Sequence, residues 1–236
     1  MLLKETSIEK NIIHIWKLEI PDSEERYNYY LNLLSYDEIA RSERFHFQKD
    51  RNEYVCCRGF LRETLSGYLS LEPEEILFDY GKHGKPEIAN NNGIDKIKFN
   101  LSHSKGHAMI AVTLNDEIGV DIELIKEIPD MMDIAKELYT SKENKLLLES
   151  DQQAAESFFK IWTRKEAVIK AVGHGLSAPL KMIDVSGDGD ISVDKSYEYE
   201  SEEFINCRIK DLTPPSGYSA AVALCGKIKE VSYFTV

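Results

Sequence analysis

Two acidic side chains alternate with apolar ones in a short run near the middle of the chain. Residues 119–123 read Gly-Val-Asp-Ile-Glu, so in a strand Val120 and Ile122 would point to one face and Asp121 and Glu123 to the other. Two carboxylates about 7 Å apart on one face repel each other, and Mg²⁺ would relieve that repulsion while taking further oxygens from water and phosphate. Alternating strands often expose charge on one side, so the pattern alone favours a solvated strand face.

A third carboxylate lies in a segment rich in basic residues. In a helix predicted over residues 152–172, Trp162, Glu166 and Lys170 follow at i, i+4 and i+8 and share one side. If Trp162 is packed, Glu166 and Lys170 lie at the margin of the core, where a carboxylate can bind a metal or take a proton and a lysine can hold a phosphate. Taken alone, the two are an ordinary helical ion pair worth a few tenths of a kcal/mol.

The third polar group is Asn-Leu-Ser-His-Ser at residues 100–104, which ends a predicted strand. Its hydroxyls and imidazole are suited to donating hydrogen bonds to phosphate oxygens. A hydrolytic pair of Ser102 and His103 is geometrically poor, because neighbours on a strand point to opposite faces. The sequence also lacks the Gly-x-Ser-x-Gly turn of such hydrolases. In isolation, this run is typical of polar residues at a strand end.

The elements that must position these groups alternate between strands and helices. The residues resembling one another at 106–112 and 217–223 suggest two α+β halves of similar plan, joined near residues 115–119, with a site between them. Glycine at 173 and 175 predicts the end of the long helix. The patterns predict strands at 12–20, 97–101, 107–114, 118–122, 204–209, 218–225 and 230–236, and helices at 24–34, 36–47 with Ser35 as N-cap, 50–68, 130–138, 141–148 and 152–172.

Composition narrows the class of protein. The chain has 236 residues and a formal net charge of −12, which disfavours binding to nucleic acid or to an anionic membrane. No apolar run approaches the roughly 20 residues that cross a bilayer. Local clusters of bases suit one small polyanionic ligand, and from charge alone ordinary solvated surface is an equally good interpretation. These clusters are Lys82, His83 and Lys85, and then Lys160, Arg164, Lys165 and Lys170.

The cysteines and the N-terminal residues predict a cytoplasmic protein. None of Cys56, Cys57, Cys207 and Cys225 has the spacing of a zinc or redox motif, and we expect all four to be reduced thiols. The first residues lack the apolar stretch and the cleavage site of a secretory signal.

The order of the motifs resembles a known enzyme family. Phe-Asn-Leu-Ser-His-Ser, Gly-Val-Asp-Ile-Glu and Trp-Thr-Arg-Lys-Glu-Ala-Val-Ile-Lys follow one another as in the surfactin-synthetase-activating type of 4′-phosphopantetheinyl transferase. The loop at 80–86, the Gly-His-Gly-Leu at 173–176 and the Arg-Ser-Glu-Arg-Phe at 41–45 are similar to further family motifs. The resemblance spans roughly residues 35–176, with the strand near Tyr218 as a looser addition.

The resemblance implies an α+β fold of two similar pseudo-symmetric halves with the active site between them. The N-terminal half, 1–117, would contact the nucleotide of coenzyme A, and the C-terminal half, 118–236, would carry the metal-binding carboxylates and the catalytic helix. Such a monomer would move the phosphopantetheine arm of coenzyme A to a serine of an apo carrier protein and release 3′,5′-ADP. Acyl, peptidyl and aryl carriers, and hence fatty-acid, polyketide and nonribosomal-peptide pathways, all stay open, as does a carrier of a lysine pathway.

The resemblance also assigns roles by position. Asp121, Glu123 and Glu166 would hold Mg²⁺, with Glu166 as the general base and Glu143 as a lesser candidate. Lys165 and Lys170 would contact the phosphates, with Asp121 and Lys170 counted in the catalytic set. The remaining coenzyme A contacts would be Ser102 and His103 at the phosphates, His103 and Lys85 nearest the 3′-phosphate, Arg41 reaching toward phosphate, and the backbone of 80–86 beside the adenine.

Two positions depart from the family pattern, and two other functions stay open. Glu38 stands where the family often has a basic residue, and Asn52-Glu53 where it has an arginine, so Arg51 or Arg58 would have to replace those contacts. A Mg²⁺-dependent phosphohydrolase would use the same carboxylates without an acceptor protein. A silent module that binds coenzyme A or a carrier protein would need none of them, although Asp121, Glu123, Glu166 and Lys170 are all present.

Overall fold

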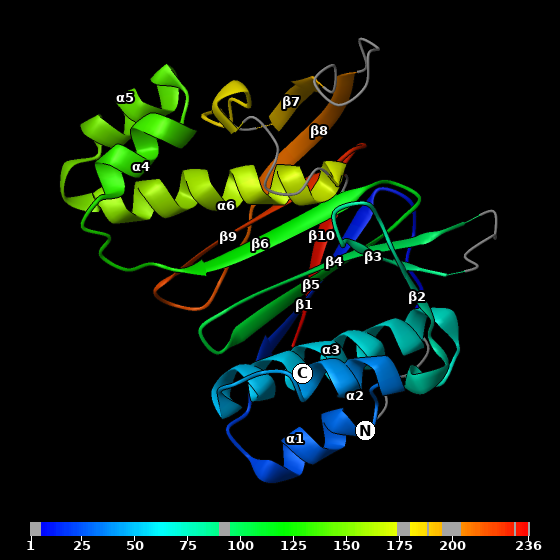
Figure 1. The fold of residues 1–236 in the computed structure, drawn as a ribbon. Coiled ribbons are helices and arrows are strands. Elements are labelled where there is room, and N and C mark those ends of the chain that lie inside the picture. The colour runs from blue at the N-terminus through cyan, green and yellow to red at the C-terminus, as the bar shows by residue number, and fades with distance from the viewer. Residues whose placement is uncertain are drawn as a thin grey trace.

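The computed structural model describes residues 6–89, 95–173, 180–187, 189–194, 204–228 and 230–235. Strands and helices build two four-stranded sheets that lie next to each other, with helices on their outer sides (Figure 1). The predicted α+β class is therefore confirmed. Within the described residues, no helix combines the length and the apolar character needed to cross a bilayer.

The first sheet has the strand order β10-β1-β5-β4. It comprises β1 (Ile12–Glu19), β4 (Ile97–Ser104), β5 (His107–Leu114) and β10 (Glu230–Thr235). Helix α3 (Gln48–Leu69) packs on its outer face, and α1 (Glu24–Leu31) and α2 (Tyr36–Ser42) pack against α3. A short ribbon of β2 (Phe78–Tyr80) and β3 (Pro86–Ile88) follows α3 and a turn of 3₁₀ helix (Pro73–Glu75).

The second sheet has the order β6-β9-β8-β7. Its strands are β6 (Ile118–Leu124), β7 (Gly189–Asp194), β8 (Phe204–Asp211) and β9 (Tyr218–Leu224). Helices α4 (Met131–Leu138), α5 (Ser141–Glu149) and α6 (Ala154–Val172) lie on its outer side, with short 3₁₀ turns at Asp151–Gln153 and Leu180–Met182. Gly119 allows α6 to lie directly on β6, because a β-carbon there would collide with the carbonyl oxygen of Ala167.

The predicted alternation along β6 is confirmed. Val120 and Ile122 are fully buried between the two sheets, in a cluster that also holds Ile13 and Met109 of the first sheet. Asp121 therefore faces the other way, toward α6. This face also carries Gly119, so the close approach of α6 brings its side chains to the acidic strand.

Strand β10 returns from the end of the described chain to the first sheet. It pairs in parallel with β1, from Ile12 opposite Glu230 to Lys17 opposite Thr235. Residues of the second predicted half thus complete the sheet of the first half. The division into 1–117 and 118–236 stays a prediction.

Several boundaries differ from those expected from the sequence. Helix α2 ends at Ser42 rather than at residue 47, and residues 43–47 form an exposed turn before α3. Ser35 is the N-cap of α2, as predicted, and Glu38 accepts a hydrogen bond from its backbone N–H. Helix α6 ends at Val172, and its C-cap Gly173 has a φ of 78°, the left-handed conformation that glycine adopts readily. The rest of the Gly-His-Gly-Leu motif lies outside the described residues.

The expectation of four reduced thiols is wrong for one pair. Cys207 on β8 and Cys225, directly after β9, form a disulfide, whereas Cys56 and Cys57 are free and buried in α3. The pairing of β8 with β9 brings the two sulfurs together across neighbouring strands. The spacing of the cysteines in the sequence carries no sign of this contact.

Candidate active site

Strands β4 and β6 meet along a seam of side-chain hydrogen bonds. Asn100 Oδ1 accepts from Val120 N at 2.9 Å, Ser102 Oγ from Ile122 N at 3.4 Å and Ser104 Oγ from Leu124 N at 3.3 Å. These three polar residues alternate along β4, so all of them point toward β6. The polar run at 100–104 therefore connects the two sheets and places His103 on the opposite side of β4.

Asp121 and Lys170 form the centre of the site. Lys170 on α6 donates to Asp121 Oδ1 at 2.6 Å, to Ser102 Oγ at 2.9 Å and to the carbonyl of Val120 at 3.3 Å. Ser102 Oγ in turn donates to Asp121 Oδ1 at 2.9 Å. The single hydroxyl proton of Ser102 is thus in use, and the structure does not support the predicted contact of this hydroxyl with phosphate. Ser102 instead orients the aspartate and the lysine.

The structure brings Glu166 to the strand that carries Asp121 and Glu123. All three carboxylates line one hollow of about 300 Å³, together with Lys170 and Trp162. Burial is the main cause that raises the pKa of both Glu123 and Glu166, and the charge of Asp121 adds to it. Their mutual repulsion shows in these shifts, as expected for three acids that share a partly buried space.

The donor set at this hollow fits a divalent cation. Asp121 Oδ2 and Glu166 Oε1 are buried and have no hydrogen-bond partner among the described residues. A buried carboxylate oxygen without a partner is costly, and a hard cation would satisfy both. No three acidic, histidine or cysteine side chains of the described chain surround one point as a finished ligand set. Mg²⁺ commonly takes one or two protein carboxylates and completes its shell with water and phosphate, and Asp121 and Glu166 supply that number.

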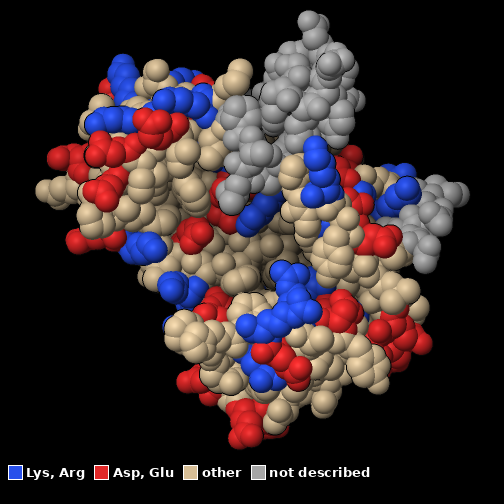
Figure 2. All heavy atoms as spheres, viewed as in Figure 1, with Lys and Arg blue, Asp and Glu red and all other residues tan. Residues whose placement is uncertain are grey.

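Two further hollows adjoin this one along β4. One, of about 330 Å³, has Arg41, Arg58, Tyr80 and His103 in its wall, and His103 also lines the acidic hollow. The other, of about 220 Å³, shares Glu166 and Lys170 with the acidic hollow and is also lined by the loop at 83–85. The first sheet with α1–α3 and the second sheet with α4–α6 form two lobes. Figure 2 shows Lys and Arg side chains gathered at the hollow between these lobes, over α2 and α3. A basic recess therefore continues from the acidic one.

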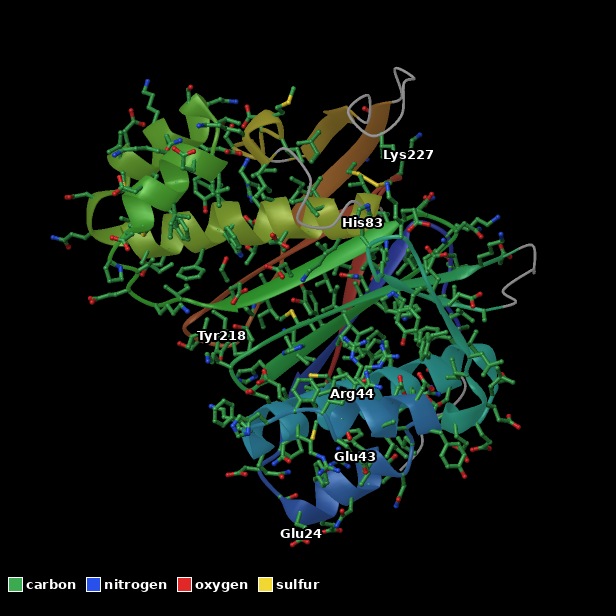
Figure 3. The ribbon with its side chains drawn as sticks, in the orientation of Figure 1. Glu24, Glu43, Arg44, His83, Tyr218 and Lys227 are labelled. Atoms are coloured by element: carbon green, nitrogen blue, oxygen red, sulfur yellow. A yellow bond between two sulfur atoms is a disulfide. The ribbon has the colours of Figure 1, made fainter. Side chains whose placement is uncertain are left out.

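The two ends of this cleft differ. Figure 3 shows His83 beside the C-terminal end of α6 and Arg44 on the facing lobe, at the α2–α3 turn. Tyr218 marks the opposite end, where its hydroxyl donates to the carbonyl of Lys105 in the β4–β5 turn at 2.7 Å. The basic groups lie on the α2–α3 side, and the carboxylates lie between β6 and α6.

The basic recess is built on a buried ion cluster that the sequence did not reveal. Glu38, which is 1 % exposed, accepts from Arg58 Nε at 2.7 Å and from Arg62 Nε at 2.5 Å. Arg58 Nη2 also donates to Tyr80 Oη at 3.3 Å, at the start of the 80–86 loop. The acidic residue at position 38 is therefore a structural anchor that holds Arg58 in the recess wall. Arg58 is one of the two replacements expected from the sequence, and its contact with the ligand stays a prediction.

Lys85 is not placed to bind a phosphate. Its ammonium donates to Glu117 Oε2 at 3.0 Å and to the carbonyls of Ile118 and Ala171, both at 3.2 Å. These acceptors engage all three of its protons. The predicted contact with the 3′-phosphate is not supported, because Lys85 ties the loop to the end of α6 instead.

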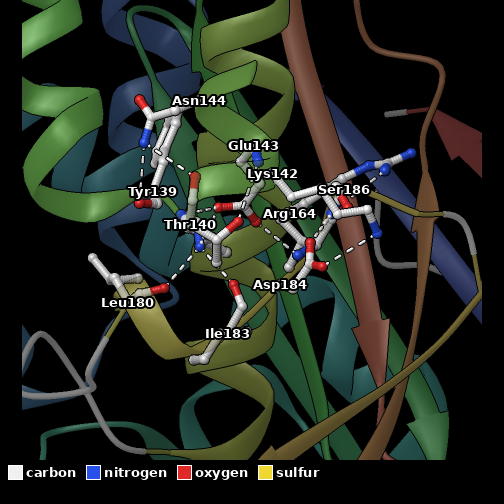
Figure 4. Close-up of polar contacts among 12 residues, drawn as sticks. Tyr139, Thr140, Lys142, Glu143, Asn144, Arg164, Leu180, Ile183, Asp184 and Ser186 are labelled. Atoms are coloured by element: carbon white, nitrogen blue, oxygen red, sulfur yellow. Dashed lines mark hydrogen bonds and ion pairs between the residues drawn. The ribbon is translucent and has the colours of Figure 1, made fainter. Parts of the chain in front are cut away.

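Lys165 points away from the cleft as well. Its ammonium donates to the carbonyls of Leu180 at 2.7 Å and Ile183 at 2.6 Å, and pairs with Glu143 Oε2 at 2.8 Å. Glu143 also accepts from the backbone N–H groups of Thr140 and Val185 (Figure 4). Both side chains are almost fully buried, so neither the phosphate contact of Lys165 nor the role of Glu143 as base is supported.

Comparison with known proteins gives one family over almost the whole chain. A model described as "4′-phosphopantetheinyl transferase superfamily" matches residues 117–223, and one described as "4′-phosphopantetheinyl transferase, N-terminal" matches residues 20–115. The chain is 37 % identical over 215 residues to the 4′-phosphopantetheinyl transferase HetI of a Nostoc species, covering 91 % of this chain and 88 % of that protein. It is 29 % identical over 208 residues to 4′-phosphopantetheinyl transferase Sfp of Bacillus subtilis, covering 87 % and 88 %.

Proposed function

The chain belongs to the 4′-phosphopantetheinyl transferase superfamily, and we propose that the cleft along β4 and β6 is where it performs its transfer, with Mg²⁺ bound. The observation that carries the proposal is the meeting of Asp121, Glu123 and Glu166 with Lys170 around one hollow. In the reaction, a carrier serine oxygen bonds to the β-phosphorus of coenzyme A. The bond from that phosphorus to the bridging oxygen breaks, and 3′,5′-ADP leaves with the bridging oxygen.

Asp121, Glu123 and Glu166 would hold the metal ion. Bound Mg²⁺ would neutralise the negative charge of the diphosphate and make it a better electrophile. The buried oxygens of Asp121 and Glu166, which find no hydrogen-bond partner in the part of the chain that the structure describes, support this assignment. So do the raised pKa values of Glu123 and Glu166, since a cation between the carboxylates would remove the repulsion that contributes to them.

Lys170 and Glu166 would act on the reacting groups. The ammonium of Lys170 lies at the boundary of the acidic hollow and the hollow of about 220 Å³, where it would offset charge that develops on the transferred phosphate. Glu166, whose pKa burial raises, would accept the proton of the serine hydroxyl directly or through a water molecule. Phosphoryl transfer needs mainly alignment and neutralisation of charge, and these two side chains supply both.

Removal of Mg²⁺ is expected to stop the transfer. We expect an apo carrier protein incubated with the enzyme, coenzyme A and Mg²⁺ to gain about 340 Da on a serine, the mass of the arm without its nucleotide. The same mixture with excess EDTA should show no gain in the mass spectrum, and added Mg²⁺ should restore it. Transfer at an undiminished rate in EDTA would contradict the metal assignment. Release of nucleotide without any carrier would favour a hydrolase.

The basic recess would hold the 3′-phosphoadenosine end of coenzyme A. Arg41, Arg58 and His103 are the cationic or protonatable side chains in its wall, and Tyr80 offers an aromatic ring. Because the ammonium of Lys85 is bonded to Glu117 and to two backbone carbonyls, Arg41 and Arg58 would make the contacts with the 3′-phosphate. An exposed arginine on the rim can form a charge-assisted, two-pronged contact with phosphate.

The Arg41→Ala variant should lose most of its preference for coenzyme A over dephospho-coenzyme A. We expect KM for coenzyme A to rise about tenfold, with kcat within twofold, and KM for dephospho-coenzyme A to change little, since one charged hydrogen-bonded contact is worth about 1.5 kcal/mol or more. Arg44→Ala is the matched control, because Arg44 lies in the turn after α2 and does not line the recess among the described residues. Equal effects of both substitutions on both substrates would contradict the assignment.

The carrier protein is proposed to dock by a local surface of the enzyme. Carrier proteins are generally acidic, and this chain also carries a net charge of −12, so long-range steering should be weak and carrier affinity should depend only mildly on salt. Acyl, peptidyl and aryl carriers all fit the proposal. We also propose that the protein is monomeric and cytoplasmic.

A further inference from the structure

Glu53 of α3 contacts His103 of β4 across a wide gap in sequence. Its Oε1 lies 3.0 Å from His103 Nδ1. The side chain of Glu53 is 18 % exposed, whereas that of His103 is 47 % exposed. The ring therefore lies closer to solvent than the carboxylate does.

The imidazole separates this carboxylate from the cleft. His103 lines both the basic recess and the acidic hollow, and among the described residues that line them Glu53 appears in neither. Glu53 instead lines a separate hollow of about 520 Å³ on the other side, with Lys49, Asn52 and Gly106. Any direct influence of Glu53 on a ligand in the cleft must therefore pass through the ring or act through space.

The contact decides which edge of the ring is available. With Nδ1 turned to Glu53, Nε2 is the nitrogen left for a ligand. Both nitrogens of an imidazolium are donors, so the ring can bond a carboxylate on one side and a phosphate oxygen on the other. A ring held in one orientation loses less rotational freedom when the ligand binds, and this preorganisation improves affinity.

Glu53 could affect the binding of an anionic ligand in two ways, and the two change the affinity in opposite directions. Acting through space alone, a carboxylate near a polyanion repels it and weakens binding. Acting through His103, it holds a donor toward the phosphates and strengthens binding. The direction of the change on removing Glu53 therefore separates the two.

We infer that Glu53 is a positioning residue, which holds His103 with Nε2 toward the phosphates of coenzyme A. This inference rests on the proposed function only in the identity of the ligand.

The test is a double-mutant cycle read by coenzyme A binding and by kinetics. The Glu53→Ala variant should bind coenzyme A about five- to tenfold more weakly in calorimetry, with KM raised to match and kcat within twofold. Glu53→Gln, whose amide oxygen still accepts from Nδ1–H, should lose less. In the His103→Ala background, Glu53→Ala should have no further effect. ¹⁵N NMR of the imidazole should show the Nδ1 resonance of His103 moving in Glu53→Ala.

The control is Glu43→Ala, which removes an exposed acid of the same lobe (Figure 3). It should leave affinity and the His103 resonances unchanged. Unchanged or tighter binding of coenzyme A by Glu53→Ala would overturn the inference, and so would an equal loss in the absence of His103. If the wild-type enzyme binds coenzyme A but modifies no carrier, the proposed transfer is overturned. A loss of affinity in Glu53→Ala that depends on His103 would still support the Glu53–His103 pair in that case.

Discussion

The Asp121→Ala enzyme should lose turnover by about three orders of magnitude or more while it stays folded. Asp121 links Lys170 and Ser102, and its second oxygen is buried without a partner among the described residues. Its removal takes away a proposed metal ligand and releases Lys170 from its position. Lys170 is 27 % exposed, so its ammonium can turn to water and the loss of stability should be modest. Carrier modification followed by mass spectrometry measures the first effect, and thermal unfolding measures the second.

Asp121→Asn sharpens this test, since the amide keeps the size of the side chain and removes its charge. We expect nearly the same loss of activity and a weaker response to added Mg²⁺. Glu127→Gln, an exposed acid just beyond β6, is the matched control and should be fully active. Asp121→Asn that transfers the arm at a rate near wild type would show that the metal is held elsewhere.

The Lys165→Met enzyme is expected to be destabilised by about 3–5 kcal/mol, because a buried Glu143 would be left without its cation. At this chain length the change corresponds to a fall in Tm on the order of 10 °C. Below its Tm, the variant should keep its KM for coenzyme A, since Lys165 faces the 180–183 segment and not the cleft. Denaturant unfolding and steady-state kinetics at low temperature measure the two quantities.

Two further variants keep this prediction sharp. Lys160→Met removes an exposed lysine of the same helix that pairs with Asp211, and it should cost no more than about 1 kcal/mol. The double variant Lys165→Met/Glu143→Gln should recover part of the lost stability, because no charge stays buried alone. A raised KM with unchanged stability in Lys165→Met would restore the role at the phosphates that the family resemblance implies.

Local periodicity predicted how the side chains at the centre of the candidate site are oriented, and the family resemblance assigned their roles. The period of two along β6 separated Asp121 from Val120, and the helical period along α6 placed Glu166 and Lys170 on one side. The same period sets Lys165 roughly 100° away from Glu166 around the helix. A motif that contains both residues does not convey this difference, and the structure places Lys165 against the 180–183 segment rather than in the cleft.

Contacts between distant segments could not be predicted in this way. The engagement of Lys85 with Glu117, the burial of Glu38 between two arginines and the Cys207–Cys225 disulfide all join elements whose relative placement depends on the whole fold. The polar run at 100–104 was expected to serve a ligand. It mainly joins the two sheets, because its side chains accept hydrogen bonds from backbone N–H groups of β6. No local pattern in the sequence predicts that β6 lies beside this run.

Because β10 pairs with β1, the first sheet can be completed only near the end of synthesis. During synthesis, β1 emerges early, but the strand that covers its outer edge is made only after residue 230. Until then the first lobe presents an open strand edge flanked by the apolar Ile13 and Ile15, a surface prone to pairing with other chains. We therefore expect a premature stop before β10 to leave the first sheet prone to aggregation, even though its other three strands are intact.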